Sequence, residues 1–129
     1  MKIILILKYL FYFLKTCPSN FADRINLGLI PTSEESWQIA CKALKSSSGG
    51  YMHIHGNVDL NNNPTNDKIK QEWIDWSNYA KTKINFLLNE TKNTNWITNV
   101  DHIEYVKSYG PRVDHIVLDL KCIPLSECK

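Results

Sequence analysis

The first two candidate strands differ in how apolar and polar residues are arranged. Residues 24–30, RINLGLI, form a short, mostly apolar run that is typical of a buried strand. Residues 51–58, YMHIHGNV, alternate instead, so His53 and His55 should share one face while apolar residues occupy the other. Gly28 interrupts the first run, and a glycine inside a strand often marks the close approach of a ligand or of another backbone.

Two further strands are predicted in the last third of the chain. Residues 100–109 and 112–123 are rich in β-branched and aromatic residues, and the Gly-Pro pair between them predicts a tight antiparallel hairpin. The second strand is the more continuously apolar one, which favours a position inside the sheet. His102 and His115 fall in this hairpin, away from the carboxyl ends of the parallel strands, and we expect them to be structural.

Helical periodicity separates the strands. Pro31 ends the first strand, and Thr32 with Glu35 forms a T-x-x-E capping box that predicts the start of a helix. Its apolar stripe consists of Trp37, Ala40, Cys41 and Leu44. A longer helix is predicted over about residues 67–90, after an asparagine-rich polar loop. Its apolar stripe consists of Ile69, Trp73, Trp76, Ala80, Ile84 and Leu87.

The resulting order is strand, helix, strand, helix, strand, strand, which places the chain in the α/β class. A strand–helix–strand unit predicts parallel strands joined by a right-handed crossover. The 129 residues fit one domain, which we expect to occupy residues 17–129. Residues 1–16 form an apolar leader that Lys8 interrupts, too short for a membrane helix and without a small-residue cleavage site.

Composition narrows the chemistry only a little. The chain has 15 basic and 13 acidic residues and a net charge of +2, which neither requires nor excludes a nucleic-acid partner. No two cysteines have the C-x-x-C spacing of a zinc or redox site, so Cys41 and Cys122 are predicted to be reduced core thiols. Neither the dinucleotide-binding nor the P-loop glycine pattern occurs.

Three segments together carry a resemblance to a known family: ADRINLGLIPTSEESW, GGYMHIHGNV and HIEYVKSYGPRVDHIVLDLKC. In this order they resemble the C-terminal region of the tRNA wybutosine-synthesising aminocarboxypropyltransferases, relatives of the tRNA guanine-N1 methyltransferases. The resemblance covers about residues 22–124. It implies the C-terminal half of a class I S-adenosylmethionine-dependent methyltransferase fold, whose last strand is inserted antiparallel between two others.

The resemblance also implies a reaction. Family members transfer the 3-amino-3-carboxypropyl group of S-adenosylmethionine to a wyosine-type guanine derivative in the tRNA for phenylalanine. The methyltransferase relatives carry an Asn-Leu-Pro turn whose Asn aligns with Gly28, and losing that amide favours aminocarboxypropyl transfer. Ligands of open α/β sheets bind at the carboxyl ends of strands, so Gly28, Leu29, Ile30 and Pro31 would form one wall of the cofactor and target-base site.

Four further residues are candidates for the substrate side. Thr32 and Ser33 lie where exposed helix N–H groups can hold an anion, although Thr32 could simply cap the helix. His53 and His55 share a face at the carboxyl end of the next parallel strand, where they could contact substrate, ligate a metal with a third residue, or make structural hydrogen bonds. No partner carboxylate is evident and the family implies no metal, so we expect none. The sequence does not identify the catalytic residues.

The glycine-containing cofactor loop of the family and its ribose-binding acidic residue are not recognisable in this chain. We therefore expect a cytoplasmic C-terminal fragment, inactive alone and without detectable binding of S-adenosylmethionine. Its expected partner is tRNA, with no role for DNA or a membrane. The alternatives are a guanine-N1 methyltransferase fragment, a non-catalytic form that binds tRNA or another partner, and a secreted or membrane-associated protein directed by the leader.

Overall fold

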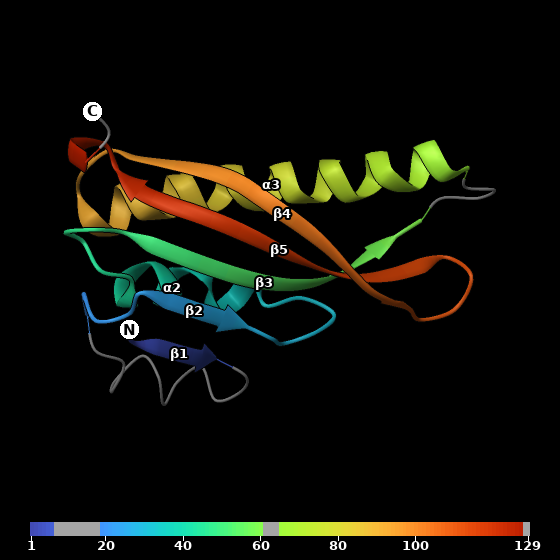
Figure 1. The fold of residues 1–129 in the computed structure, drawn as a ribbon, viewed down its shortest axis with the longest axis horizontal. Coiled ribbons are helices and arrows are strands. Elements are labelled where there is room, and N and C mark those ends of the chain that lie inside the picture. Colours follow the sequence, from blue (N-terminus) through green and yellow to red (C-terminus); the bar gives the residue numbers. More distant parts are fainter. Residues whose placement is uncertain (7–18, 61–64, 128–129) are drawn as a thin grey trace.

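The described residues form a mixed five-stranded sheet and two α-helices (Figure 1). The computed structural model describes residues 1–6, 19–60 and 65–127. In chain order the elements are β1 (Ile3–Ile6), β2 (Arg24–Leu27), η1 (Glu34–Ser36), α2 (Trp37–Ala43), β3 (Gly50–Asp59), α3 (Asn66–Lys92), β4 (Trp96–Ser108), β5 (Val113–Pro124) and η2 (Leu125–Glu127). The strand order across the sheet is β1-β2-β3-β5-β4, which confirms the predicted α/β class.

The first three strands are parallel. β2 pairs with β3 from Arg24↔Tyr51 to Leu27↔Ile54, and α2 lies in the connection between them, as the strand–helix–strand order predicted. β1 comes from the start of the apolar leader and pairs in parallel with β2. Ile4 packs against the core, whereas Ile3 is exposed. The rest of the leader, Cys17 and Cys128 lie outside the described residues.

β5 lies between β3 and β4 and is antiparallel to both. Its ladder with β3 runs without a register shift from Gly50↔Cys122 to Asp59↔Val113. The predicted hairpin and the interior position of the second hairpin strand are therefore both confirmed. A strand with neighbours on both sides has no free backbone edge, which suits the buried side chains along most of β5.

One face of the sheet packs against both helices and forms the core. The largest fully buried side chains are Trp37, Ile25, Leu27, Leu44, Met52, Ile54, Ile84, Leu88, Ile116, Leu118, Leu120 and Cys41. Cys41 and Cys122 are buried free thiols, as predicted. Burial raises the pKa of Cys41 to about 12 and that of Cys122 well above its ordinary value, so neither thiol ionises near neutral pH.

Three predicted boundaries differ from the structure for local reasons. β2 ends at Leu27 because the chain then turns to lie along the end of β3. The capping box does not form, since the Thr32 hydroxyl accepts the N–H of Glu34 (3.1 Å) and the helical segment opens with a 3-10 turn. β3 runs from Gly50 to Asp59, one residue beyond the predicted run 51–58 at each end, because β5 provides pairing partners that far.

The ends of α3 are closed by side chains. The Thr65 hydroxyl accepts the N–H of Lys68 (3.3 Å), and Asn93 leaves the helix with φ of 54°. The half-buried ammonium group of Lys92 donates to the carbonyl oxygens of Leu44 (2.6 Å) and Lys42 (3.0 Å). It thereby ties the last turn of α3 to the end of α2, where free helix carbonyls favour a cation.

β4 departs from regular geometry at two places. Its register against β5 shifts at Asp101 and again at Val106, which marks β-bulges. Thr98 hydrogen-bonds to α3 and Tyr105 stacks on an α3 tryptophan, although these two residues are seven positions apart. Side chains at odd separations lie on opposite faces of a regular strand, so the bulge at Asp101 is what brings both to the helix side.

Gly56 is required where α3 crosses β3. A Cβ atom at this position would stand 2.3 Å from Cζ2 of Trp76. We expect Gly56→Ala to lower the free energy of unfolding by about 1–3 kcal/mol, because the half-buried ring must shift. Urea denaturation measures this loss. In a Trp76→Leu background the penalty should shrink, and an unchanged penalty there would contradict the steric explanation.

Candidate functional site

Residues 28–32 form a loop at the carboxyl edge of the parallel strands. The carbonyl oxygen of Pro31 accepts the N–H of Asn57 (3.0 Å), and Thr32 makes an isolated antiparallel bridge with Gly56. These contacts hold the loop against the end of β3, while Gly28, Leu29 and Ile30 stay half-exposed and Pro31 is exposed. The loop is thus positioned where ligands of open α/β sheets bind. Its contact with a cofactor stays a prediction.

The two hydroxyl residues after this loop have different environments. Thr32 is exposed, and its hydroxyl is an acceptor within the turn. Ser33 is only 1% exposed, and its hydroxyl accepts the indole N–H of Trp37 (3.0 Å). A buried hydroxyl already bonded to a core tryptophan favours a structural role for Ser33 over the predicted contact with substrate.

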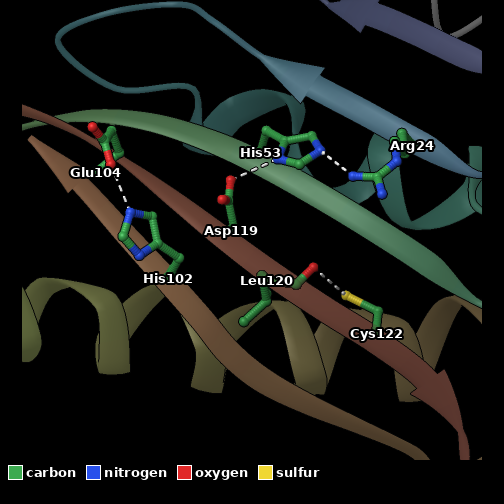
Figure 2. Close-up of polar contacts among 7 residues, drawn as sticks. All are labelled: Arg24, His53, His102, Glu104, Asp119, Leu120 and Cys122. Atoms are coloured by element: carbon green, nitrogen blue, oxygen red, sulfur yellow. Dashed lines mark hydrogen bonds and ion pairs between the residues drawn. The ribbon is translucent and has the colours of Figure 1, made fainter. Parts of the chain in front are cut away.

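His53 lies in the middle of a row of polar side chains that crosses three strands (Figure 2). Its Nδ1 is 2.6 Å from a carboxylate oxygen of Asp119 on β5, and its Nε2 is 3.1 Å from the guanidinium of Arg24 on β2. Arginine has no acceptor, so Nε2 must accept and Nδ1 carries the proton that goes to Asp119. The row therefore fixes the orientation of the imidazole and the role of each ring nitrogen.

This row is inside the sheet, not at its carboxyl edge. His53 pairs with Asn26, which precedes the last residue of β2, and β3 continues to Asp59. The expected position of His53 at the edge is therefore wrong, because His53 lies within the pairing of β2 with β3 and β3 continues to Asp59. Of the alternatives open for His53, its contacts favour structural hydrogen bonding.

His55 does lie at the edge, where it faces a second histidine. His55 Nδ1 is 2.9 Å from Nε2 of His115, and the two ring centroids are 5.1 Å apart. Burial lowers the pKa of both imidazoles, and the neighbouring charge of His115 lowers that of His55 further. The other ring nitrogen of His115 is buried and has no hydrogen-bond partner among the residues that the structure describes.

The placement of His115 corrects a prediction. Sequence reasoning set this residue apart from the carboxyl edge, but the antiparallel register pairs it with Asn57, next to the end of the loop at Pro31. His102 is exposed on β4, which β3 and β5 separate from β2, and it bonds to Glu104 (2.6 Å; Figure 2). The position of His115 follows from the register of β5 against its neighbours. The turn residues of the hairpin do not determine that register, so the sequence could not place this histidine.

Tyr51 extends the polar face toward the amino end of β3. Its ring stacks on His53 with centroids 6.3 Å apart, and the guanidinium of Arg24 lies 4.6 Å from the ring centroid. The tyrosine hydroxyl hydrogen-bonds to Asp101, which raises its pKa. Arg24, Asp101 and Asp119 are therefore parts of the polar face that sequence reasoning missed, because each comes from a different strand.

Among the described residues, no group of three or more histidine, cysteine, aspartate or glutamate side chains is arranged to hold a metal ion. His55 and His115 lie within hydrogen-bonding distance of one another, and they form no metal-binding group with a third such side chain among the described residues. No helix in the described ranges is long and apolar enough to cross a membrane. The arrangement instead offers aromatic rings, fixed hydrogen-bonding groups and one arginine.

Comparison with known proteins identifies the family of this chain. The chain is 42% identical over 143 aligned positions to the Bos taurus protein named tRNA wybutosine-synthesizing protein 2 homolog, and 42% identical over 126 to that of Danio rerio. The matches cover 82% and 83% of this chain. The Oryza sativa protein named tRNA wybutosine-synthesizing protein 2/3/4 is 43% identical over 107 positions. The chain belongs to the tRNA wybutosine-synthesizing protein 2 family.

The suspected family is thus confirmed, although no family model matches the chain. The chain spans 33% of the length of the Bos taurus relative and 9% of that of the rice protein. Its fold is similar to that of M. jannaschii TYW2, solved in complex with AdoMet, with a TM-score of 0.60, 20% identity, and coverage of 86% of this chain and 42% of the other. The fold is also similar to that of Trm5b from Pyrococcus abyssi, with a TM-score of 0.54 and 21% identity. The match covers 80% of this chain and 26% of Trm5b.

The paired histidines make stability depend on pH. Their pKa values are lowered in the folded state, so the unfolded chain binds more protons as pH falls below about 6.5. We expect the contribution of the two imidazoles to the free energy of unfolding to be complete above that pH. It should be lost as the pH falls toward their lowered pKa values in the folded state. The midpoint of urea denaturation would be measured at pH 7.5 and pH 5.5, about one unit above and below 6.5. The two midpoints should differ less in His115→Gln than in the wild type.

His102→Gln is the matched control for this measurement, because it removes an exposed histidine that is paired with Glu104. It should keep the wild-type fall in stability on acidification. If His102→Gln and His115→Gln behave alike, the facing histidines are not the source of the pH dependence.

Proposed function

We propose that this chain is the target-side part of a transferase that moves the 3-amino-3-carboxypropyl group of S-adenosylmethionine to a wyosine-type guanine derivative in the tRNA for phenylalanine. The observation that carries the proposal is identity of about 40% to proteins named for wybutosine synthesis, along more than four fifths of the chain. A tRNA substrate and a cytoplasmic place of action follow from the same proposal.

The geometry supports this assignment at one loop. Residues 28–31 stand at the carboxyl edge of β2 and are fixed to β3 through Pro31, so they can form a rigid wall beside a bound donor. S-adenosylmethionine supplies the electrophilic carbon when it is bound, and the wall decides which carbon faces the target. The absence of a side chain at Gly28 leaves room there for a donor turned away from methyl transfer.

The competing function is methyl transfer to guanine N1, since the fold is also similar to that of Trm5b. The two reactions use one donor and one class of RNA, and they differ in the group that is moved. The mass added to the tRNA therefore separates them directly. In the methyltransferase relatives an asparagine aligns with Gly28, so this position is the place to test the difference.

A chimera tests the proposed reaction. Residues 22–124 of this chain would replace the matching segment of the Danio rerio relative, and the product tRNA would be digested and weighed by mass spectrometry. We expect the mass of one aminocarboxypropyl group. Gly28→Asn should lower that transfer about tenfold or more by crowding the reacting centre. Addition of a methyl group by the unsubstituted chimera would contradict the proposal.

Two controls keep this result interpretable. Lys42→Ser changes an exposed residue of α2 remote from the loop and should leave transfer unchanged. Thermal melting of each chimera checks that it folds. A folded chimera that transfers neither group would also contradict the proposal.

The chain alone should bind its donor poorly. We expect residues 1–129 to give no measurable heat with S-adenosylmethionine in calorimetry, because the family's glycine-containing donor loop is not recognisable in their sequence. The unsubstituted chimera should bind in the same experiment. Micromolar binding by residues 1–129 would show that β1 and the loop at residues 28–31 complete a donor pocket without the rest of the relatives.

A further inference from the structure

The turn that joins β4 to β5 carries an unusual combination of exposed rings and cations. Residues 105–112, YVKSYGPR, are here called the hairpin tip. Tyr105 and Tyr109 keep 46% and 43% of their surface exposed. The tip contains two cations, Lys107 and Arg112, and no acidic residue. This composition is typical of surfaces that stack on unpaired bases and contact phosphates.

Each exposed ring is backed by an inner ring. Tyr105 stacks on Trp73 of α3 with centroids 5.7 Å apart and planes 17° apart. Tyr109 stacks on His115 of β5 at 5.8 Å and 26°. A ring supported in this way presents its outer surface without first losing side-chain freedom, which lowers the entropic cost of binding.

The tip is also braced by hydrogen bonds. The carboxylate of Asp114 accepts from the indole of Trp73 (3.0 Å) and from the hydroxyl of Ser108 (2.8 Å). This aspartate is 4% exposed, so its carboxylate points inward, whereas the exposed Asp59 pairs with Val113 beside the turn. The N–H of Leu60 donates to the carbonyl of Arg112, which anchors the far side of the turn.

Lys107 supplies a movable cation. Its ammonium group lies 4.5 Å from the centroid of the Tyr109 ring, and its charge lowers the pKa of His115. The lysine side chain is flexible and exposed, so it can move from the ring to a phosphate when a base approaches. A site of this kind favours an anionic ligand that also has aromatic faces.

The position of the tip relates it to the loop at residues 28–31. β3 ends at Asp59, which pairs with Val113, so the turn extends past the last parallel pair of the sheet (Figure 1). His115, which supports Tyr109, faces His55 at the same edge. A ligand on the tip can therefore continue toward the proposed target-base site.

We propose that the hairpin tip is a contact surface for unpaired nucleotides of the RNA substrate. This inference rests on the proposed function and adds to it where the RNA lies. Tyr109 stacks on a base beside the modified one and Lys107 contacts a neighbouring phosphate, while Tyr105 and Trp73 support the hairpin from the helix side. The target base is thereby held near the carboxyl edge by contacts that do not read its identity.

Fluorescence anisotropy with residues 1–129 and a fluorescein-labelled transcript of the tRNA for phenylalanine tests this surface. We expect Tyr109→Ser and Lys107→Glu each to weaken binding at least about fivefold. Lys107→Glu should also flatten the dependence of affinity on salt, because one phosphate contact is lost. Tyr109→Phe keeps the ring and should bind like the wild type.

Matched controls come from the rest of the surface. Phe86→Ser removes a 61% exposed ring from α3, and Lys42→Glu reverses an exposed charge on α2. Both should leave the affinity unchanged. Lys107→Gln removes the positive charge without adding a negative one, so it tests the same contact if the glutamate disturbs the hairpin. Thermal melting checks that each variant folds.

The outcomes separate this inference from the proposed function. If the wild-type chain does not bind the transcript, or if Phe86→Ser and Lys42→Glu weaken binding as much as the tip variants, the surface is wrong. If the tip variants alone weaken binding while the chimera adds a methyl group or nothing, the surface stands and the proposed reaction fails.

Discussion

The uninterrupted antiparallel ladder between β3 and β5 is the constraint on which the other features depend. It pairs Gly50 with Cys122 at one end and Asp59 with Val113 at the other, without a register shift. A slip of one residue would turn every β5 side chain to the opposite face. Leu118 and Leu120 would then leave the core, so the apolar face and the polar face are fixed together by one register.

The polar face shows what such a register makes possible. Residues far apart in the chain come into hydrogen-bonding distance because each projects from a neighbouring strand on the same side: Arg24 and His53, His53 and Asp119, His55 and His115. Side chains held on strands keep their geometry better than side chains on loops. The chain thus carries a polar surface held on strands beside a loop and a hairpin turn.

Local pattern was enough to predict elements but not their cross-strand partners. The alternation around Met52 and the stripe from Trp37 to Leu44 predicted a strand and a helix that the structure contains, since each depends on nearest neighbours in sequence. The partners of His53 were not predictable in the same way, because Asp119 reaches it through pairing across 66 positions. The capping box at Thr32 failed for a related reason: tertiary pairing with Gly56 holds that residue in an extended bridge.

The two bulges in β4 restrict how this hairpin can change in length. Between Asp101 and Val106 the strand presents Ile103 toward the helices, and beyond Val106 the alternation reverses again. Deleting one residue inside this interval would turn the intervening side chains to the opposite face of the sheet. A deletion that also removes a bulge would return each side chain to its original face. Natural length variation in homologous hairpins should therefore concentrate in the turn or remove a bulge together with its extra residue.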